Sequence, residues 1–437
     1  TSVECPSLRT LTIQNCPKLS TFLDTNSTKK DEQEGMSSVA TQSLFQEKVV
    51  FPNLTKLTLR ALKIKKLWPD QLPTASSSMQ NLKRLEVDEC HSLEYLLSST
   101  MAKGFSQLQY LCVKNCRAIE EIITTKELIE EGKMETISFH LLKDVELVDL
   151  PKLRIFNSSR TSVECPNLSM LTIQNCPQLR TFLDTNSTKK DEQEGMSSVA
   201  TQSLFQEKRC GTFLPSFISF NNLKTLRVSH CPKVINLLAS STARGLVHLS
   251  TISIIKCKQL TEIITTSEED ETKGEIVFKK LKTLVLDDLP SLRRFYSGNT
   301  SIAFPKLTKL ILCRCPELRS FSCGTINSSQ LTSIITQIDY ELIDKLWRRY
   351  FEFYEGAKPK ELVWEGDINT TVLKLWENDP ITSIRHLFME TLDTSMKAFQ
   401  NLFCLVMFLK SLLLPRTNRL DWFLRLNLLK MTCRMLP

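Results

Sequence analysis

Cysteine is the residue type with the most chemical potential in this chain of 437 residues, because fifteen thiols could form disulfides or bind zinc. Cys313 and Cys315 form a CxC pair, but no second ligand pair follows at the spacing of a zinc site. The number of cysteines is odd, and most of them stand where other parts of the chain place Leu or Phe. We therefore expect reduced, apolar thiols in a cytoplasmic protein, with no bound metal.

Residue types that commonly act in catalysis are dispersed along the chain. The five histidines are His91, His140, His230, His248 and His386. The sequence contains no phosphate-binding loop, dinucleotide fingerprint, HExxH, GxSxG or protein-kinase signature. Adjacent acids such as Asp287 and Asp288 are typical of a solvated surface. The sequence gives no positive evidence for catalysis, so we expect neither an enzyme nor a cofactor.

The positive charge is concentrated near the end of the chain. The formal net charge is +8, and from Ser395 onward seven Lys or Arg residues accompany one acid, Asp421. The remainder of the chain is therefore close to neutral, with mixed charges. Nucleic-acid binding requires clustered cations that displace counterions. We expect a protein partner and no nucleic acid.

The candidate residues lie within a repeated pattern, Leu-x-x-Leu-x-(Leu/Ile/Val)-x-x-(Cys/Leu), often followed by Pro-x-Leu. Its ten copies begin at Leu8, Leu54, Leu82, Leu108, Leu142, Leu168, Leu223, Leu249, Leu281 and Leu307. A pattern with this period is typical of leucine-rich repeats, in which each unit buries its apolar side chains against its neighbours. It predicts an elongated array whose usual role is to bind other proteins.

Each repeat contains an alternation of apolar and polar residues with period two, which predicts a short strand such as Thr10–Gln14. Leu11 and Ile13 would then point into the core, and the residues between them would face the opposite side of the sheet. Short helices are predicted at Ser98–Gln107 and Ser240–His248. The fold class is an α/β solenoid: a leucine-rich-repeat horseshoe with a parallel concave sheet, an irregular or short-helical convex side and a partly helical C-terminal segment.

The domain organisation follows from where the pattern is kept and where it stops. Residues 1–326 form an array of about ten units with polar inserts at 25–48 and 185–208, which we expect to be mobile surface loops. Residues 327–394 form a capping or mixed segment, in which Leu331–Tyr354 has the spacing of an amphipathic helix. Residues 395–437 form a basic, apolar tail. We interpret its apolar run, Ala398–Leu414, as a buried capping helix in preference to a membrane attachment.

One block of the array occurs twice. Thr1–Lys48 and Thr161–Lys208 differ at only five positions, which are Ser7/Asn167, Arg9/Ser169, Thr10/Met170, Lys18/Gln178 and Ser20/Arg180. This near-identity indicates a recent duplication. Because one unit buries too little apolar surface to stand alone, and the chain opens inside a unit, we predict an exposed edge at the N-terminal end.

The consensus residues of the repeats resemble those of plant disease-resistance proteins. These are the intracellular nucleotide-binding, leucine-rich-repeat immune receptors of the coiled-coil type. Phe-Pro-x-Leu precedes the strand at Phe51–Leu54 and Phe304–Leu307, and Cys-Pro-x-Leu often follows it. The segments Asn81–Ile123 and Asn222–Ile264 are especially similar to the C-terminal arrays of these receptors. The resemblance covers roughly Thr1–Phe321. It implies a module that senses pathogen effectors, directly or through a guarded host protein, and restrains a nucleotide-binding switch that this sequence lacks.

The candidate binding residues are the strand residues predicted to face the concave side. They are Lys56, Thr58, Arg60, Arg84, Glu86, Asp88, Tyr110, Lys114, Asp144 and Glu146. This mixture of cations, acids and one tyrosine suits the recognition of a protein. The simpler interpretation of each one is an ordinary solvated strand residue.

Three other functional classes fit the sequence less well. A substrate-recruiting adaptor of the F-box type also has cysteine-bearing repeats, but usually carries Thr-Asp after the cysteine where this chain has Pro-x-Leu. An extracellular receptor ectodomain would favour Asn in place of that cysteine. Peripheral membrane attachment through the tail is the third alternative, and Ala398–Leu414 is too short and too polar for a confident membrane span.

Overall fold

The computed structural model describes twelve stretches of the chain: residues 3–19, 21, 43–46, 49–69, 79–124, 135–157, 161–182, 212–214, 220–266, 274–331, 333–337 and 360–363. The chain divides into two compact units, Thr1–Asn369 and Thr370–Pro437. Every element described below belongs to the first unit. The predicted tail at 395–437 and its helix Ala398–Leu414 lie outside the described residues.

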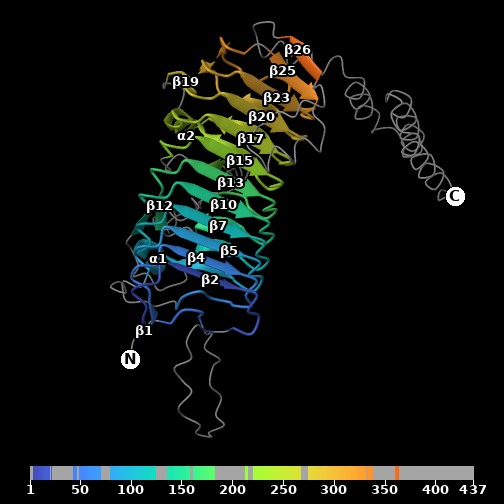
Figure 1. Cartoon of the computed structure of the whole chain (residues 1–437). Coiled ribbons are helices and arrows are strands. Elements are labelled where there is room, and N and C mark those ends of the chain that lie inside the picture. The colour runs from blue at the N-terminus through green and yellow to red at the C-terminus, as the bar shows by residue number, and fades with distance from the viewer. Residues whose placement is uncertain are drawn as a thin grey trace, which may run out of the picture. The chain divides into compact units, whose positions relative to one another are not determined.

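The main element is a parallel sheet of eleven five-residue strands that follow one another in sequence order (Figure 1). The strands are β2 (Thr10–Gln14), β4 (Lys56–Arg60), β5 (Arg84–Asp88), β7 (Tyr110–Lys114), β10 (Asp144–Val148), β13 (Met170–Gln174), β15 (Thr225–Ser229), β17 (Thr251–Ile255), β20 (Thr283–Asp287), β23 (Lys309–Cys313) and β25 (Ser333–Gln337). The first ten coincide with the ten copies of the sequence pattern. The predicted α/β leucine-rich-repeat solenoid is confirmed.

The alternation within each strand places its residues on two sides of the sheet. In β4, Leu57 and Leu59 are fully buried, whereas Lys56, Thr58 and Arg60 retain access to solvent. The strands pair without an offset, so the second and fourth residues form continuous apolar rows, each side chain contributing about 1.5–3 kcal/mol. We call the opposite side, formed by the first, third and fifth residues of each strand, the sheet face.

Each of the first ten strands is followed directly by a residue with a left-handed backbone. These residues have φ between 50° and 57°, and they are Asn15, Ala61, Glu89, Asn115, Asp149, Asn175, His230, Lys256, Asp288 and Arg314. In the first nine of them the backbone N–H donates to a carbonyl of the next rung, as Asn15 shows by donating to the carbonyl of Arg60 at 3.0 Å. The turn into the core is thus made by the residue before the Cys/Leu position of the pattern.

The cysteine that follows this turn is a packing residue. Cys90, Cys116, Cys231 and their counterparts inside the ladder are fully buried thiols. Their sulfur also lies within reach of the strand that they follow, as Cys231 Sγ donates to the carbonyl of Ser229 at 3.2 Å. Burial raises the pKa of Cys90 to about 11, so this thiol stays protonated and unreactive at neutral pH.

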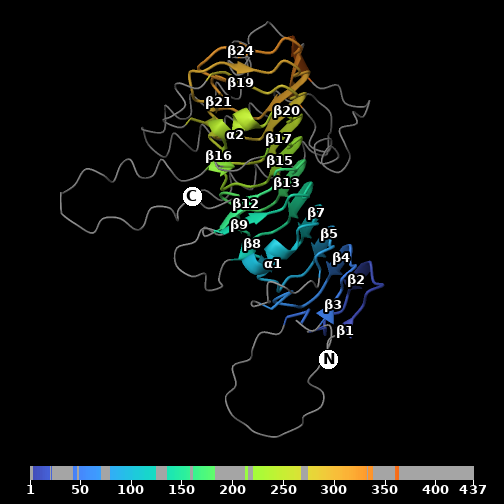
Figure 2. The same ribbon diagram turned by 90° about the vertical axis from the view of Figure 1, so that its left-hand side faces the viewer.

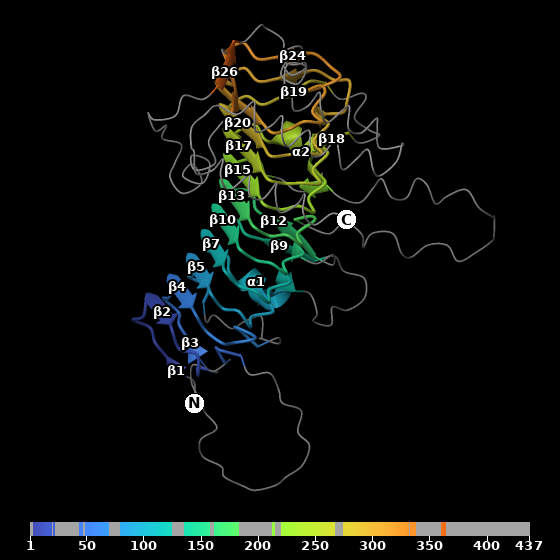
Figure 3. The same cartoon turned by 90° about the vertical axis from the view of Figure 1, so that its right-hand side faces the viewer.

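The side of the array away from the sheet consists largely of short parallel strands (Figures 2 and 3). They form five narrow sheets: β1 (Val3–Glu4) with β3 (Val49–Val50); β6 (Tyr95–Ser98), β8 (Glu121–Thr124) and β11 (Ile155–Asn157); β9 (Glu135–Ser138) with β12 (Thr161–Glu164); β14 (Thr212–Leu214), β16 (Asn236–Ala239), β18 (Glu262–Thr265) and β21 (Arg294–Tyr296); and β19 (Ile276–Val277), β22 (Ile302–Ala303) and β24 (Ile326–Asn327). The sequence analysis predicted an irregular or short-helical side and did not predict these strands.

Two short helices occur where the sequence predicts them. They are α1 (Ser99–Gly104) and α2 (Ser240–Gly245), both shorter than predicted. The Ser98 hydroxyl caps α1 by accepting from the Met101 N–H at 3.3 Å, whereas α2 has no side-chain cap.

Behind the sheet, phenylalanine rings of neighbouring rungs stack on one another. The ring centroids of Phe295 and Phe321, for example, are 4.5 Å apart.

The structure corrects the sequence analysis at the C-terminal end of the array. The predicted helix Leu331–Tyr354 is wrong over Ser333–Gln337, which forms β25 and pairs in parallel with β23. A final strand, β26 (Lys360–Val363), pairs with β25 in the antiparallel direction and completes the twelve-stranded sheet. The remainder of the predicted helix, residues 338–354, lies outside the described residues.

The polar insert at 25–48 also differs from expectation near its end. Leu44 and Phe45 are buried, and the Phe45 ring stacks against Trp68 with centroids 6.1 Å apart. Ser43 forms an isolated bridge with Lys66. Residues 43–46 therefore pack on the neighbouring rung and are not part of a solvated loop. The rest of this insert, apart from these four residues, and the whole insert at 185–208 lie outside the described residues.

The duplicated block gives a matched test of the apolar rows. Leu171 lies inside the ladder and is fully buried, whereas Leu11, at the same position of the edge copy, is only partly buried. Leu171→Ala should lower the free energy of unfolding by about 2–5 kcal/mol. Leu11→Ala should lower it by less than about half as much, because less apolar surface is buried there. Urea unfolding of both variants measures the difference; equal losses would contradict the assignment of β2 as an edge.

The left-handed turns give a second prediction. Ala61 has φ of 53°, which strains any residue with a Cβ, so Ala61→Gly should raise the free energy of unfolding by up to about 1 kcal/mol. The same substitution inside α1, Ala102→Gly, should lower it by about 0.5–1 kcal/mol because helix interiors disfavour glycine. Thermal unfolding of the two variants should give shifts of opposite sign, and a loss of stability in both would refute the explanation.

Candidate protein-binding face

The ten predicted binding residues come together on four adjacent strands, β4, β5, β7 and β10. The strand register places them in three rows across the sheet face, one for each of the first, third and fifth strand positions. The rows are Lys56, Arg84, Tyr110 and Asp144; Thr58, Glu86, Cys112 and Glu146; and Arg60, Asp88, Lys114 and Val148. Cys112 and Val148 complete this array and were not among the predicted residues. We call the twelve residues the charged end of the sheet face.

Ion pairs join neighbouring strands throughout the charged end. Glu86 is paired with Lys56 at 3.9 Å and with Arg84 on its own strand, and it also accepts a hydrogen bond from the Thr58 hydroxyl at 3.2 Å. Arg60 bridges to Asp88 at 3.4 Å. These contacts pair the charged side chains with one another in the absence of a partner.

The other half of the charged end contains one further ion pair and an aromatic contact. Lys114 Nζ lies 2.7 Å from the Glu146 carboxylate, which also accepts a long contact from Cys112 Sγ at 3.7 Å. The guanidinium of Arg84 lies over the Tyr110 ring, 3.7 Å from its centroid, in cation–π geometry. Burial raises the pKa of Tyr110, so its hydroxyl is neutral at physiological pH.

Cations and acids differ in how far they reach into solvent. The cationic side chains retain 38–51% of their exposure and the acidic ones only 23–29%; the cations are Lys56, Arg60, Arg84 and Lys114, and the acids are Glu86, Asp88 and Glu146. An approaching molecule therefore meets positive groups first, although the two signs balance in number when Asp144 is included.

The carboxylates of the charged end differ in their protonation chemistry. Burial of Glu86 opposes its ionisation, but the hydrogen bond and charge of Arg84, together with Lys56, lower its pKa below the ordinary value. Burial of Asp144, reinforced by the negative charge of Glu146, instead raises the pKa of Asp144. An additional positive neighbour would favour the ionised form of Asp144.

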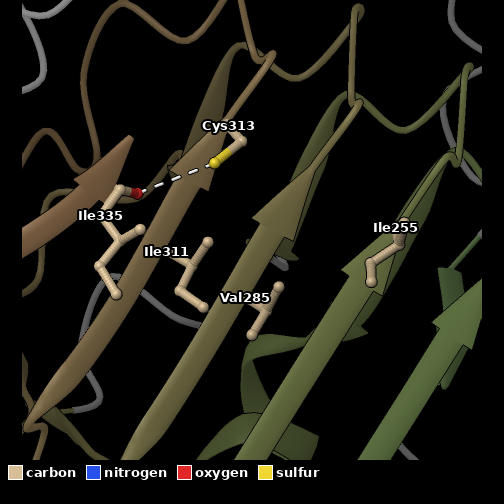
Figure 4. Close-up of a cluster of buried hydrophobic side chains, with 5 residues drawn as sticks. All are labelled: Ile255, Val285, Ile311, Cys313 and Ile335. Atoms are coloured by element: carbon tan, nitrogen blue, oxygen red, sulfur yellow. Dashed lines mark hydrogen bonds between the residues drawn. The ribbon is translucent and has the colours of Figure 1, made fainter. Parts of the chain in front are cut away.

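The opposite end of the sheet face is apolar, which the sequence analysis missed. Ile255, Val285, Ile311, Cys313 and Ile335 occupy third and fifth strand positions from β17 to β25 and are all buried. Figure 4 shows these side chains on neighbouring strands, with Cys313 Sγ directed to the carbonyl of Ile335 at 3.9 Å. The signal was present in the sequence, because apolar residues replace polar ones at alternate positions of β20 and β23.

A buried carboxylate lies beside this apolar end. Asp287, at the fifth position of β20, is aligned with Cys313 and Ile255 and is fully buried. Its Oδ2 forms an ion pair with Arg314, while its Oδ1 has no hydrogen-bond partner. Burial raises the pKa of Asp287 to about 6, and the positive charge of Arg314 only partly opposes this shift. The sequence analysis interpreted Asp287 as a solvated acid, which is wrong.

Other kinds of site were sought in the part of the chain that the structure describes. No group of three or more His, Cys, Asp or Glu side chains there is arranged as metal ligands would be. Within the same stretches, neither helix has the length and apolar character that crossing a bilayer requires. The sheet face is the surface with the clearest binding chemistry.

The ladder of aliphatic rows, with its exposed strand residues, defines a leucine-rich-repeat module, a class of recognition domain. A family model described as plant disease resistance protein RPS2-like, leucine-rich repeats, matches residues 53–193 and 195–334, together more than half of the chain. The chain belongs to this family, and its resemblance to the leucine-rich-repeat region of plant disease-resistance proteins is confirmed. Neither a curated protein nor a solved structure matches the chain.

The raised pKa of Asp287 gives a prediction of pH dependence. The folded protein holds this proton up to about pH 6, whereas an unfolded Asp loses it near pH 4, so stability falls as the pH rises between these values. Asp287→Asn removes this loss. Relative to the unmodified protein, the variant should gain up to about 3 kcal/mol in free energy of unfolding between pH 4 and pH 7.

Urea unfolding gives the free energy of unfolding of the variant and of the unmodified protein at each pH. The difference between the two proteins is then compared at pH 4 and pH 7, so that the titration of groups common to both proteins cancels. A constant difference between Asp287→Asn and the unmodified protein at both pH values would show that folding does not raise the pKa of Asp287.

Proposed function

We propose that this chain is the protein-binding module of an intracellular plant immune receptor, and that it senses a pathogen effector or a guarded host protein in the cytoplasm. The proposal rests on the array of charged and aromatic side chains on β4, β5, β7 and β10. These side chains are aligned across the strands, form ion pairs with one another and are accessible to solvent. The apolar end is buried, whereas the side chains of the charged end remain accessible to solvent.

The chemistry of the charged end supports a partner with an acidic surface. Its cations reach further into solvent than its acids do. Exposed ion pairs contribute only about 0–1 kcal/mol each to stability. Lys56 or Arg60 can therefore leave its acid on the sheet face and pair with an acid of the partner at a small cost in free energy. Arg84 and Tyr110, stacked on the two middle strands of the array, are of the residue types that dominate binding energies.

The proposal includes no enzymatic step, and the module acts by binding alone. In a receptor that also carries a nucleotide-binding domain, this domain would be the second partner of the module. The module restrains it until an effector binds. Both partners are proteins, so competition for a shared surface provides a simple means of release. The family assignment supports this part of the proposal, because it places the repeats among disease-resistance proteins.

Charge reversal tests the proposal directly. The triple variant Lys56→Glu, Arg60→Glu and Arg84→Glu turns the outermost groups of the charged end from positive to negative. Tagged chains would be recovered from leaf tissue with and without pathogen, and the captured proteins quantified by mass spectrometry. The variant should capture at least about tenfold less of the infection-dependent partner, since reversed charges repel its acidic surface.

A second variant with the same change in net charge provides the control. Lys63, Lys83 and Lys152 are exposed residues outside the strands of the main sheet, and their replacement by Glu should leave capture unchanged. Circular dichroism must show that both variants are folded. Equal capture by all three proteins rejects the charged end as the binding surface. Capture of a ubiquitin-ligase scaffold would support the F-box adaptor instead.

A further inference from the structure

The residues that directly precede the first ten strands of the main sheet form a ladder of their own. From the second rung onward, the backbone N–H of each donates to the carbonyl of its predecessor at 2.7–3.1 Å. This ladder lies at the ends of the strands opposite the arrowheads in Figure 1. Its members are Arg9, Thr55, Lys83, Gln109, Lys143, Ser169, Lys224, Ser250, Lys282 and Thr308.

Cations occupy every second position of this ladder. Arg9, Lys83, Lys143, Lys224 and Lys282 are all exposed, and an uncharged polar residue stands between each pair. Neighbouring strands are about 4.8 Å apart, so successive cations are separated by about 9.6 Å. This separation is close to the Debye length at physiological salt, about 8 Å. Each cation therefore repels the next only weakly, while their attraction for a surface that meets all five of them adds up.

The hydroxyl residues between the cations cover the negative ends of the backbone dipoles. Thr55 Oγ1 donates to the carbonyl of Arg9 at 2.9 Å, and Ser250 Oγ donates to the carbonyl of Lys224 at 2.9 Å. Each of these two carbonyls also accepts two backbone N–H groups from the following rung. An approaching anion therefore meets side-chain cations at these rungs and no open carbonyl.

The turns that lead into the ladder add positive charge and no negative charge. We call the ladder residues, together with the three residues before each, the basic edge. Its further cations are Lys279, Lys280 and Lys306, and it contains no Asp or Glu. The ammonium of Lys280 lies 2.8 Å from His248 Nδ1, which accepts from it as a neutral imidazole.

The cations of the basic edge differ from those of the sheet face in lacking counter-charges. On the sheet face, Lys56, Arg60, Arg84 and Lys114 are each paired with an acid. None of the eight cations of the basic edge forms an ion pair with a side chain in the stretches that the structure describes. The array is close to neutral as a whole, but this edge is left with unbalanced positive charge.

The composition of the basic edge argues against a protein partner. Lysine is depleted at protein–protein interfaces, whose binding energy comes mainly from Trp, Tyr and Arg anchors. Seven of the eight cations of the basic edge are lysines, and no Phe, Tyr or Trp accompanies them. Single-stranded nucleic acids also bind largely by stacking on aromatic side chains, which this edge does not offer.

Double-stranded nucleic acid fits the spacing poorly. Duplex DNA carries one charge per about 1.7 Å of its axis, whereas the ladder cations stand in single file about 9.6 Å apart. A layer of anionic headgroups presents negative charge over an area, so it can neutralise the ladder and the lysines beside it together. Flexible lysine side chains suit such a surface, because they require no fixed geometry of their anions.

We propose that the basic edge is a second interaction surface and that it docks on an anionic membrane, with its lysines among the charged lipid headgroups. Polybasic segments bind anionic lipids by this electrostatic attraction without crossing the bilayer. The residues of the basic edge are distinct from those of the sheet face. The proposal is therefore independent of the protein that the sheet face binds.

Vesicle sedimentation of the full chain tests this proposal. Vesicles of phosphatidylcholine and phosphatidylserine are compared with vesicles of phosphatidylcholine alone at physiological ionic strength. In the edge variant, Lys83, Lys143, Lys224 and Lys282 are all replaced by Gln. Its partition coefficient on the anionic vesicles should be at least about tenfold lower than that of the unmodified chain, since each lysine contributes to the attraction. The basic tail is identical in both chains and cannot cause the difference.

A variant with the same loss of charge provides the control. Lys18, Lys63, Lys152 and Lys258 are exposed lysines in the turns that follow the strands, and their replacement by Gln should leave vesicle binding unchanged. Circular dichroism must show that both variants are folded. An equal loss in the two variants overturns the proposal, because net charge alone would then explain the binding. Equal binding by all three chains, or equal binding to neutral and anionic vesicles, also overturns it.

An added cation tests the same surface in the opposite direction. Gln109→Lys places a charge on the rung between Lys83 and Lys143 and should raise the partition coefficient by about fivefold. An unchanged coefficient contradicts the proposal, even where the edge variant fails to fold. A fluorescent DNA duplex supplies the remaining outcome. Duplex binding that the edge variant loses, without binding to anionic vesicles by the unmodified chain, would assign the basic edge to nucleic acid and make the proposal wrong.

Discussion

The structure depends on one constraint, the unshifted stacking of aliphatic side chains from rung to rung. Leu57 is buried because Leu11 and Leu85 lie at the same height on the strands beside it. A rung by itself buries one thin layer of apolar side chains, too little to offset the entropy of ordering its backbone. The parallel hydrogen bonds and the aliphatic rows therefore stabilise each other, and stability is shared between neighbours.

The same register creates the recognition surface. Lys56, Arg84 and Tyr110 are far apart in the sequence, yet stacking brings them into one row across the sheet. Because the core needs only the second and fourth strand residues, the first, third and fifth are free to vary between rungs. The sheet face therefore changes from charged to apolar along its length while the core beneath it stays uniform.

The sequence predicted the fold well because period and alternation directly encode the ladder. It also placed the ten binding candidates on one face, since their strand positions follow from the pattern. β25 was missed because Thr336 stands at its fourth strand position, where the pattern requires an aliphatic residue, and no Cys/Leu position follows. The burial of Asp287 could not be predicted, because it depends on neighbours from other rungs. The packing of Phe45 on Trp68 is likewise a contact between segments that no local pattern encodes.

The duplicated block has an evolutionary consequence. It adjoins β4 in one place and β15 in the other, and it forms the same backbone contacts with both. Unequal recombination between the two copies would delete or duplicate the rungs that lie between them, without disturbing the ladder. Progeny alleles would gain or lose whole rungs and thereby acquire new combinations of surface residues. A joint of this kind allows the array to change its length in whole rungs.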